Sequence, residues 1–335
     1  MSNTSNIVRA GVDSYLIYAE ESTYKTDPGS YTKNFGILSS FSPEWSNNLN
    51  KIRGSNGPLP SDNTTPTARD AQDILDGNAE GSLSVEIEPQ EFRWLKLVMG
   101  SESGSGTDAD PYEYPQTSGG TDSEKLKYLD IPSITVVASH LYGGSNDSSD
   151  ASYKALGGKV SDATISGSSG EEITASLTIP FAEAVPDDSL ETGVAVPSKD
   201  VYNFDSSIIE VPNGTTVDNV IQSFELTIEN NVSLRHGMGS FTAQDALTGE
   251  RNFSLSLELD HENVTYLKDV IQSQSSYKST LFSEVTIKLE RSSTSLIAHC
   301  LNVKPESDNL SEDFPDPVSE SLQLEPELVY FEEVV

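Results

Sequence analysis

The sequence has little cysteine, little positive charge and no long apolar run. Cys300 is its single cysteine, so no disulfide can form within the chain and packing alone has to stabilise the fold. No window approaches the roughly 18–20 consecutive apolar residues that a membrane helix requires. The N-terminus has no basic segment followed by an apolar one, so we expect no secretory signal. These absences predict a protein that assembles in a cytoplasm without a membrane partner.

The shortage of positive charge argues against one class of partner. The 335 residues include 20 Lys and Arg against 53 Asp and Glu, which gives a net charge of −33 and a pI near 4.2. Proteins that wrap nucleic acid need clustered basic residues to bind phosphates, and this chain has no such cluster. The acidic composition fits a surface that stays soluble at high salt, where screening weakens the repulsion between carboxylates.

Residues that could support catalysis or bind a metal are scattered along the chain. The histidines share no spacing with an acid or a nucleophile; they are His140, His236, His261 and His299. Cys300 follows His299 but has no further ligands at metal spacing. Asp108 and Asp110 lie in an acidic loop that lacks the alternating ligands, glycine and distant glutamate of a calcium loop. We therefore expect no enzyme, no metal and no cofactor.

Two segments of the chain are nearly the same. SLSVEIEPQEFRWLKLV at 82–98 matches SLSLELDHENVTYLKDV at 254–270 without a gap, so residue numbers differ by a constant 172. Upstream, 39–48 resemble 222–231 with a constant difference of 183, so the first copy carries about eleven extra residues between the matched blocks. A repeat of this length indicates a duplicated domain, because the units of a solenoid are only about 20–50 residues long.

Length differences and linkers fall in segments rich in turn residues. The extra residues lie in GSNGPLPSDNTTPTA at 54–68, a composition that predicts an exposed loop. Residues 100–122 form a second low-complexity stretch, which we interpret as a solvated loop, and 185–200 have linker composition. The sequence thus predicts a first domain, a linker and a second domain at 1–185, 186–206 and 207–335.

Both copies show the same change of hydrophobic period. Leu83, Val85 and Ile87 alternate with polar residues, as expected of a strand with one buried face, and 255–259 repeat the pattern. The spacing of the apolar residues that follow, over 92–98 and 264–271, predicts a helix of about three turns in each copy. The other apolar runs are short, β-branched and bounded by turn residues, which predicts strands over 131–142, 157–166, 171–184, 283–291, 294–303 and 321–333. Residues 207–224 predict a strand, an Asn213-Gly214 turn and another strand. The expected fold class is mainly β with flanking helices: two tandem β-sandwich or barrel domains, each with one short α-helix.

Several stretches of the chain resemble the tail tube proteins of tailed phages and archaeal tailed viruses. They follow the order that the family uses and lie at 18–44, 77–100, 153–181 and 223–240. The resemblance implies a structural protein of the virion tail. Its inner strands would join neighbouring subunits into a closed barrel, and stacked rings would form a hollow tube that carries the genome to the host. An acidic lumen would let DNA slide through without specific binding. The chain departs from the family in the 100–122 loop, the 185–200 linker and its acidic C-terminal third.

The resemblance also implies partners. The chain would bind itself, and it would meet the tape measure, terminator and tail-tip or baseplate proteins. Tubes of this family usually present six domains per ring, so a chain with two domains predicts three chains per ring with pseudo-sixfold symmetry, and six chains is the alternative. The family places a long loop at 54–68 that reaches toward the adjacent ring. Here that loop includes Gly54 and Asp62, with Arg53 and Arg69 at its base.

A tail-tip or surface adhesin that binds host glycans is the alternative function. A β-sandwich of that kind predicts aromatic side chains clustered on exposed loops. Tyr112 and Tyr114, in the 100–122 loop, are the nearest candidates for such a cluster.

Overall fold

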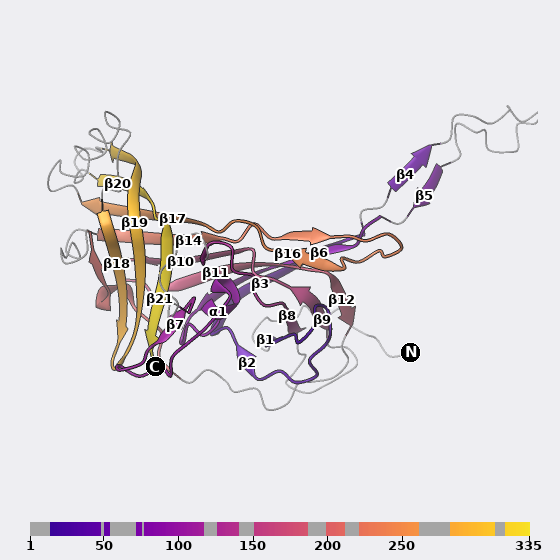
Figure 1. Ribbon diagram of the computed structural model, residues 1–335, viewed down its shortest axis with the longest axis horizontal. Helices are drawn as coiled ribbons and strands as arrows, with labels where there is room; N and C mark the ends of the chain where they lie inside the picture. Colours follow the sequence, from indigo (N-terminus) through magenta and orange to yellow (C-terminus); the bar gives the residue numbers. More distant parts are fainter. Residues whose placement is uncertain are drawn as a thin grey trace, which may run out of the picture.

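The described part of the chain consists mainly of antiparallel strands (Figure 1). The computed structural model describes residues 14–47, 50–53, 72–75, 77–116, 126–140, 151–186, 199–211, 221–260, 282–311 and 319–335. None of the helices in these segments is long and apolar enough to cross a membrane.

The largest sheet has twelve strands, and its main path follows the order β13-β18-β19-β20-β17-β14-β10-β11-β6-β3, while β21 pairs with β19 and β7 with β21. Every strand pair in it is antiparallel. Its strands are β3 (Ile37–Ser46), β6 (Glu80–Glu88), β7 (Tyr112–Tyr114), β10 (Asp162–Ser168), β11 (Thr174–Phe181), β13 (Ile208–Glu210), β14 (Ile221–Glu229), β17 (Asn252–Asp260), β18 (Phe282–Arg291), β19 (Thr294–Ser311), β20 (Ser319–Glu325) and β21 (Leu328–Val334).

A second sheet has five strands in the order β12-β9-β8-β1-β2. They are β1 (Ser14–Glu20), β2 (Lys33–Asn34), β8 (Ile134–His140), β9 (Ala151–Gly158) and β12 (Glu183–Pro186). Two small hairpins complete the β structure: β4 (Asn50–Arg53) with β5 (Gln72–Leu75), and β15 (Ser233–Arg235) with β16 (Asp245–Leu247). The β4–β5 hairpin projects away from the rest of the chain, whereas β15–β16 lies beside the start of β6 (Figure 1).

One hydrophobic core cluster joins the inner faces of the sheets. The predicted alternation is confirmed, since Leu83, Val85 and Ile87 are buried in β6 and the side chains of 255, 257 and 259 are buried in β17. Ile173 and the inward residues of β11 belong to the same cluster. These faces become buried because successive side chains of a strand point to opposite sides of the sheet.

The α-helix of the described chain is shorter than predicted. Helix α1 spans Leu95–Met99, although the apolar spacing predicted about three turns from residue 92 onward. The backbone N–H of Phe92 donates instead to the carboxylate of Glu333 (2.7 Å), so this residue precedes the helix. Gly100 ends it with φ 92°, a left-handed conformation that favours glycine. The helix expected over 264–271 lies outside the described residues, and a short 3-10 helix, η2, spans Phe204–Ser206.

Several predicted strand boundaries are wrong because the chain changes its pairing partner within or beyond the predicted run. The expected strand at 321–333 divides into β20 and β21, which pair with different halves of β19. The strand expected at 294–303 extends to Ser311, with a register shift between Pro305 and Ser307. A bulge bends a strand and tolerates a proline that cannot donate to the ladder. The run at 157–166 likewise contains the end of β9, a short connection and the start of β10.

One strand order occurs twice along the large sheet. β3-β6-β11-β10, the first strand set, is followed by β14-β17-β20-β19, the second strand set. Ser40 pairs with Glu86 in the first set, and Ser223 pairs with Glu258 in the second. A register shift immediately precedes the serine in both cases. Each serine hydroxyl also donates to the carboxylate of its partner, at 3.1 Å and 3.0 Å.

The two hairpins occupy corresponding places between the first and second strands of each set. Asn50 pairs with Leu75 in β4–β5, and Ser233 pairs with Leu247 in β15–β16. Asn50 and Ser233 differ by 183 in residue number, as the upstream repeat blocks do. Leu75 and Leu247 differ by 172, as the downstream repeat blocks do. The segment between β4 and β5, which contains the predicted 54–68 loop, lies outside the described residues.

Candidate functional site

The ends of the strand order are candidate assembly surfaces. β3 lies at one end of the main path, with β6 as its neighbour. β19 pairs with β18 and β21 through its first part and with β20 through residues 304–311. In the described chain the second strand set therefore ends at this distal part of β19. A strand at the end of a sheet offers a ladder that another chain can extend.

The contact between β10 and β14 joins the two strand sets inside the chain. Seven residue pairs form this seam, from Asp162 with Glu229 to Ser168 with Ser223. The hydroxyls of Thr164 and Thr227 lie 3.1 Å apart across it. This seam shows, within one chain, how β10, the last strand of the first set, pairs with β14, the first strand of the second set.

Asn230 fixes the end of this seam. Its side chain is buried and donates to the carbonyls of Val98 and Val160, both at 3.0 Å. Its backbone N–H donates to the carbonyl of Ser161 at 2.7 Å. The amide thus joins β14 to the end of α1 and to the segment that leads into β10.

Arg251 is buried beside Asn230 without a carboxylate partner among the described residues. Its guanidinium donates to four oxygens, which are Asn230 Oδ1 (2.7 Å) and the carbonyls of Leu126 (2.9 Å), Val98 (3.0 Å) and Leu129 (3.3 Å). Burial lowers the pKa of Arg251 to about 10, which leaves it charged at neutral pH. The side chain therefore has a structural role, since it satisfies carbonyls that no strand or helix pairs.

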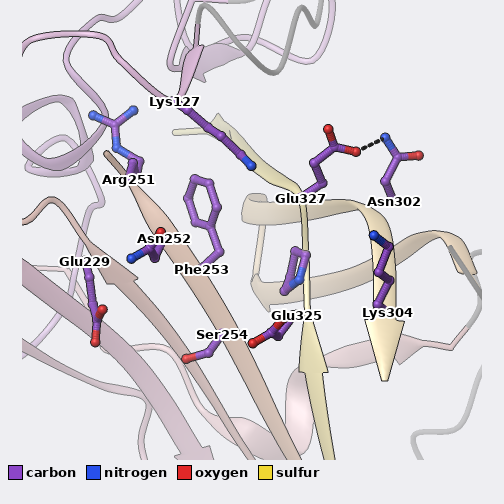
Figure 2. Close-up of a pocket in the computed structure, with 11 residues that line it drawn as sticks. Lys127, Glu229, Arg251, Asn252, Phe253, Ser254, Asn302, Lys304, Glu325 and Glu327 are labelled. Atoms are coloured by element: carbon purple, nitrogen blue, oxygen red, sulfur yellow. Dashed lines mark hydrogen bonds between the residues drawn. The ribbon is translucent and has the colours of Figure 1, made fainter. Parts of the chain in front are cut away.

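A pocket of about 530 Å³ opens where β14, β17 and β20 end on this side of the sheet (Figure 2). We call it the β17 pocket. Glutamates, basic side chains and the ring of Phe253 surround it, and Glu327 accepts a hydrogen bond from Asn302 at 2.9 Å. Its lining residues are Lys127, Glu229, Arg251, Asn252, Phe253, Ser254, Asn302, Lys304, Glu325, Pro326 and Glu327.

The β15–β16 hairpin is a further candidate contact surface. The side chains of Met238 and Phe241 near its tip are exposed by 107% and 63%. Behind them, the carbonyl of Phe241 accepts a hydrogen bond from the N–H of Ala79 at 2.6 Å. The sequence analysis did not single out this glycine-rich segment as a contact. Its signal was the pair of large apolar residues in a turn, where a soluble monomer usually presents polar ones.

A comparison with known protein families identifies the family of the chain. A family model described as "Phage tail tube protein" matches residues 11–325. The chain belongs to the phage tail tube protein family. No curated protein matches the chain.

Family membership establishes the general role. A tail tube protein is a structural component of the virion tail, assembled in the host cell, that builds a tube from copies of itself and associates with other tail proteins. Members of this family are generally structural rather than enzymatic. In the described residues of this tube protein, no group of three His, Cys, Asp or Glu side chains could hold a metal ion.

The predicted ring-contact residues of the tube protein are only partly described. Arg53 ends β4, and its backbone pairs with Gln72 of β5. Gly54, Asp62 and Arg69 lie outside the described residues. The contact of this loop with an adjacent ring therefore stays a prediction.

The 100–122 stretch of the tube protein is not a purely solvated loop. Tyr112–Tyr114 form β7, which pairs with β21. The ring of Tyr114 is fully buried, and its hydroxyl donates to Glu333 at 2.9 Å. Tyr114 is therefore not one of the exposed aromatic side chains that the adhesin alternative requires. Apolar tyrosine rings in an otherwise polar loop pack onto the core because burial of such a ring stabilises the fold.

Proposed function

We propose that the chain is a tandem duplication of one tube domain, and that its copies close rings which stack into the conduit for genome DNA. The repeated strand order supports the duplication. The matched register shifts before Ser40 and Ser223 and the matched hairpins support it as well, since unrelated domains have no reason to share such irregularities. We place the two domains at 1–185 and 207–335, joined by the 186–206 linker.

Ring closure would repeat the internal seam between chains. Inside the chain, the last strand of the first set, β10, pairs with the first strand of the second set, β14. In the same order of strands, the first strand of the first set is β3 and the last strand of the second set is the distal part of β19. A second copy can therefore place its β3 along this β19 and continue the same order of strands. A closed ring leaves no open edge, which also protects the strands from aggregation.

The face of the sheet that lies away from the core suits a DNA conduit. In β3, β6, β10, β11, β14, β17 and β20, the outward positions hold Ser, Thr, Asn, Gln, Asp and Glu, apart from Ile37 and Pro180. On β19 the same face holds the exposed Lys304, which pairs with Glu325. Phosphates bind through clustered basic side chains, so DNA that passes such a wall meets acidic and neutral side chains at nearly every outward position. This polar, mostly acidic and neutral face is the observation that carries the conduit proposal.

Three chains per ring agree best with two domains per chain. A closed trimer would present six strand sets around the lumen, with threefold symmetry of the chains and approximate sixfold symmetry of the inner wall. A ring of six chains would leave one set of each chain outside the wall, although both sets here belong to one continuous sheet.

Electron microscopy and mass measurement of the purified protein test the function. We expect rings or tubes in negative stain, and a ring mass three times that of the 36.2 kDa chain. A ring with six times the chain mass would contradict the trimer but not the tube. Dispersed monomers at all salt and protein concentrations would contradict ring assembly.

The projecting β4–β5 hairpin supports the proposal that the 54–68 loop contacts an adjacent ring (Figure 1). We assign that contact to the loop that contains Gly54, Asp62 and Arg69, with Arg53 at its base. The ends of the tube would meet the tape measure, terminator and tail-tip or baseplate proteins.

A further inference from the structure

We propose that the β17 pocket receives the β4–β5 hairpin of a second copy of the chain. This inference rests on the proposed ring, because it places the hairpin on the chain whose β19 pairs with β3. It adds a defined contact between neighbouring chains beside the strand seam.

The β15–β16 hairpin already makes the corresponding contact inside one chain. It lies across the start of β6, where Thr242 forms a parallel bridge with Ala79. The imidazole Nε2 of His236 lies 3.2 Å from the carbonyl oxygen of Ala79, and its Nδ1 lies 3.9 Å from the carboxylate of Glu80. The hairpin that follows β14 is thus held on the first strand set.

The surface that the β15–β16 hairpin covers on the first strand set is the counterpart, in the sequence repeat, of the β17 pocket on the second set. In the sequence repeat, Ala79, Glu80 and Gly81 are the counterparts of Arg251, Asn252 and Phe253, which line the pocket, and Ser46 is the counterpart of Glu229. On the first strand set, the matching pocket includes Thr242 of the β15–β16 segment among its lining residues. On the second set, the eleven described lining residues include none from either hairpin.

The strand order leads the β4–β5 hairpin of a neighbouring chain to this position. β15–β16 leaves the end of β14 and crosses β10 and β11 to reach β6. By the same path, β4–β5 leaves the end of β3 and would cross β19 and β20 of the next chain to reach β17. In its own chain this hairpin projects away from the sheet, as an element that docks on another molecule does (Figure 1).

The residues at the contact have compatible chemistry. In the repeat, Arg53 of β4 corresponds to His236, so the basic Arg53 of one chain would stand beside Asn252 of the next. Glu229, Glu325 and Glu327 line the pocket around that position. Carboxylates and amide oxygens are suitable acceptors for a guanidinium, which presents five N–H donors.

Thiol cross-linking of assembled protein tests this contact. Arg53 and Asn252 are replaced by cysteine in one variant, R53C/N252C, which is treated with a short bis-maleimide. The matched control, H236C/E80C, places the pair at the corresponding contact within one chain. Cys300 is fully buried and serves as the background in the unmodified protein.

We expect R53C/N252C to give covalent dimers and trimers on a denaturing gel, in a yield similar to the internal link of the control, which keeps the mass of one chain. If rings or tubes are visible and the control reacts, but R53C/N252C keeps the mass of one chain, the docking inference is wrong. The proposed ring is not contradicted by that result. If the variant and the unmodified protein form no rings at all, the proposed function itself fails.

Discussion

At the scale of single residues, Arg251 has the clearest structural role. Its buried guanidinium satisfies Asn230 and three backbone carbonyls around the end of α1. Arg251→Ala would remove the donor to Asn230 Oδ1 and to the carbonyls of Leu126 and Leu129, while the carbonyl of Val98 keeps the donor from the Asn230 amide. Buried oxygens without donors cost about 1–3 kcal/mol each. We expect a loss of roughly 3 kcal/mol or more in the free energy of unfolding, measured by urea denaturation. Arg235→Ala, at an exposed position in β15, should change it by less than about 0.5 kcal/mol. Equal effects of both substitutions would contradict the role.

Glu333 predicts a specific dependence of stability on pH. Burial raises the pKa of this carboxyl from 4.5 to about 7, although the N–H of Phe92 and the hydroxyl of Tyr114 donate to it. The folded chain therefore binds this proton more tightly than the unfolded chain does. The stabilising contribution is complete below about pH 4.5 and is lost as the pH rises through about 7.

The substitution Glu333→Gln removes this titration. Between about pH 5 and 8 the unmodified protein should lose about 3 kcal/mol of stability relative to the variant, since one pKa unit corresponds to about 1.4 kcal/mol. The melting temperature of both proteins across this range measures the difference. Glu225→Gln, on the exposed face of β14, is the control and should leave the pH profile unchanged. Parallel profiles for Glu333→Gln and the unmodified protein would show that the carboxyl titrates normally.

At the scale of elements, the seam between β10 and β14 predicts how β3 of one chain would be aligned with β19 of the next. Thr164 and Thr227 face each other across β10 and β14. The sequence repeat makes Glu44 in β3 the counterpart of Thr227. Asn309 in β19 is the counterpart of Thr164 by strand register, since Thr164 pairs through Ser176 with Glu86, and Asn309 through Ser321 with Glu258. We expect N309C/E44C to form a disulfide between chains in assembled rings. T164C/T227C should form one within a chain, because its hydroxyls already lie 3.1 Å apart. A linked T164C/T227C beside an unlinked N309C/E44C, in rings seen by microscopy, would exclude this register.

The hairpin loop supplies a second prediction at this scale. Shortening 54–66 to the length of the matching β15–β16 turn should leave folded, soluble subunits, since a surface connection tolerates length changes at small entropic cost. Such subunits should no longer form long tubes. Tube length in negative stain is the measurement, and circular dichroism checks the fold. Tubes of normal length from this variant would show that the loop is not needed for stacking.

Elements with a regular pattern could be predicted from the sequence, and irregular ones could not. The alternation of Leu83, Val85 and Ile87 predicted a buried strand face because the period of a strand is fixed by its pleat. The upstream repeat blocks, 39–48 and 222–231, also contain the two matching serines that follow the register shifts. By contrast, the burial of Tyr114 depends on Glu333, a residue more than two hundred positions away, and no local pattern contains that contact. The passage of β19 from one set of neighbours to another also depends on strands distant in the sequence.

At the scale of the whole molecule, we expect the net charge to affect assembly. Stacked rings that carry −33 per chain would bring many carboxylates together. The repulsion reaches far at low ionic strength, because the Debye length is about 30 Å near 0.01 M salt and about 3 Å at 1 M. We expect tubes to be stable in molar salt and to dissociate on dialysis into millimolar salt, as followed by light scattering and melting temperature. Tubes that keep their length and melting temperature after dialysis would contradict this dependence.

The unequal hairpins have a consequence for how rings could be arranged along the tail. In a ring of three chains, the longer segment between β4 and β5, at 54–71, would alternate with the shorter one between β15 and β16, at 236–244. If all six hairpins of a ring were identical, the next ring could stack on it in any of six rotations, one every sixth of a turn. With long and short hairpins in alternation, only rotations by a third of a turn would be equivalent. The orientation of each added ring would therefore be set by the ring below it.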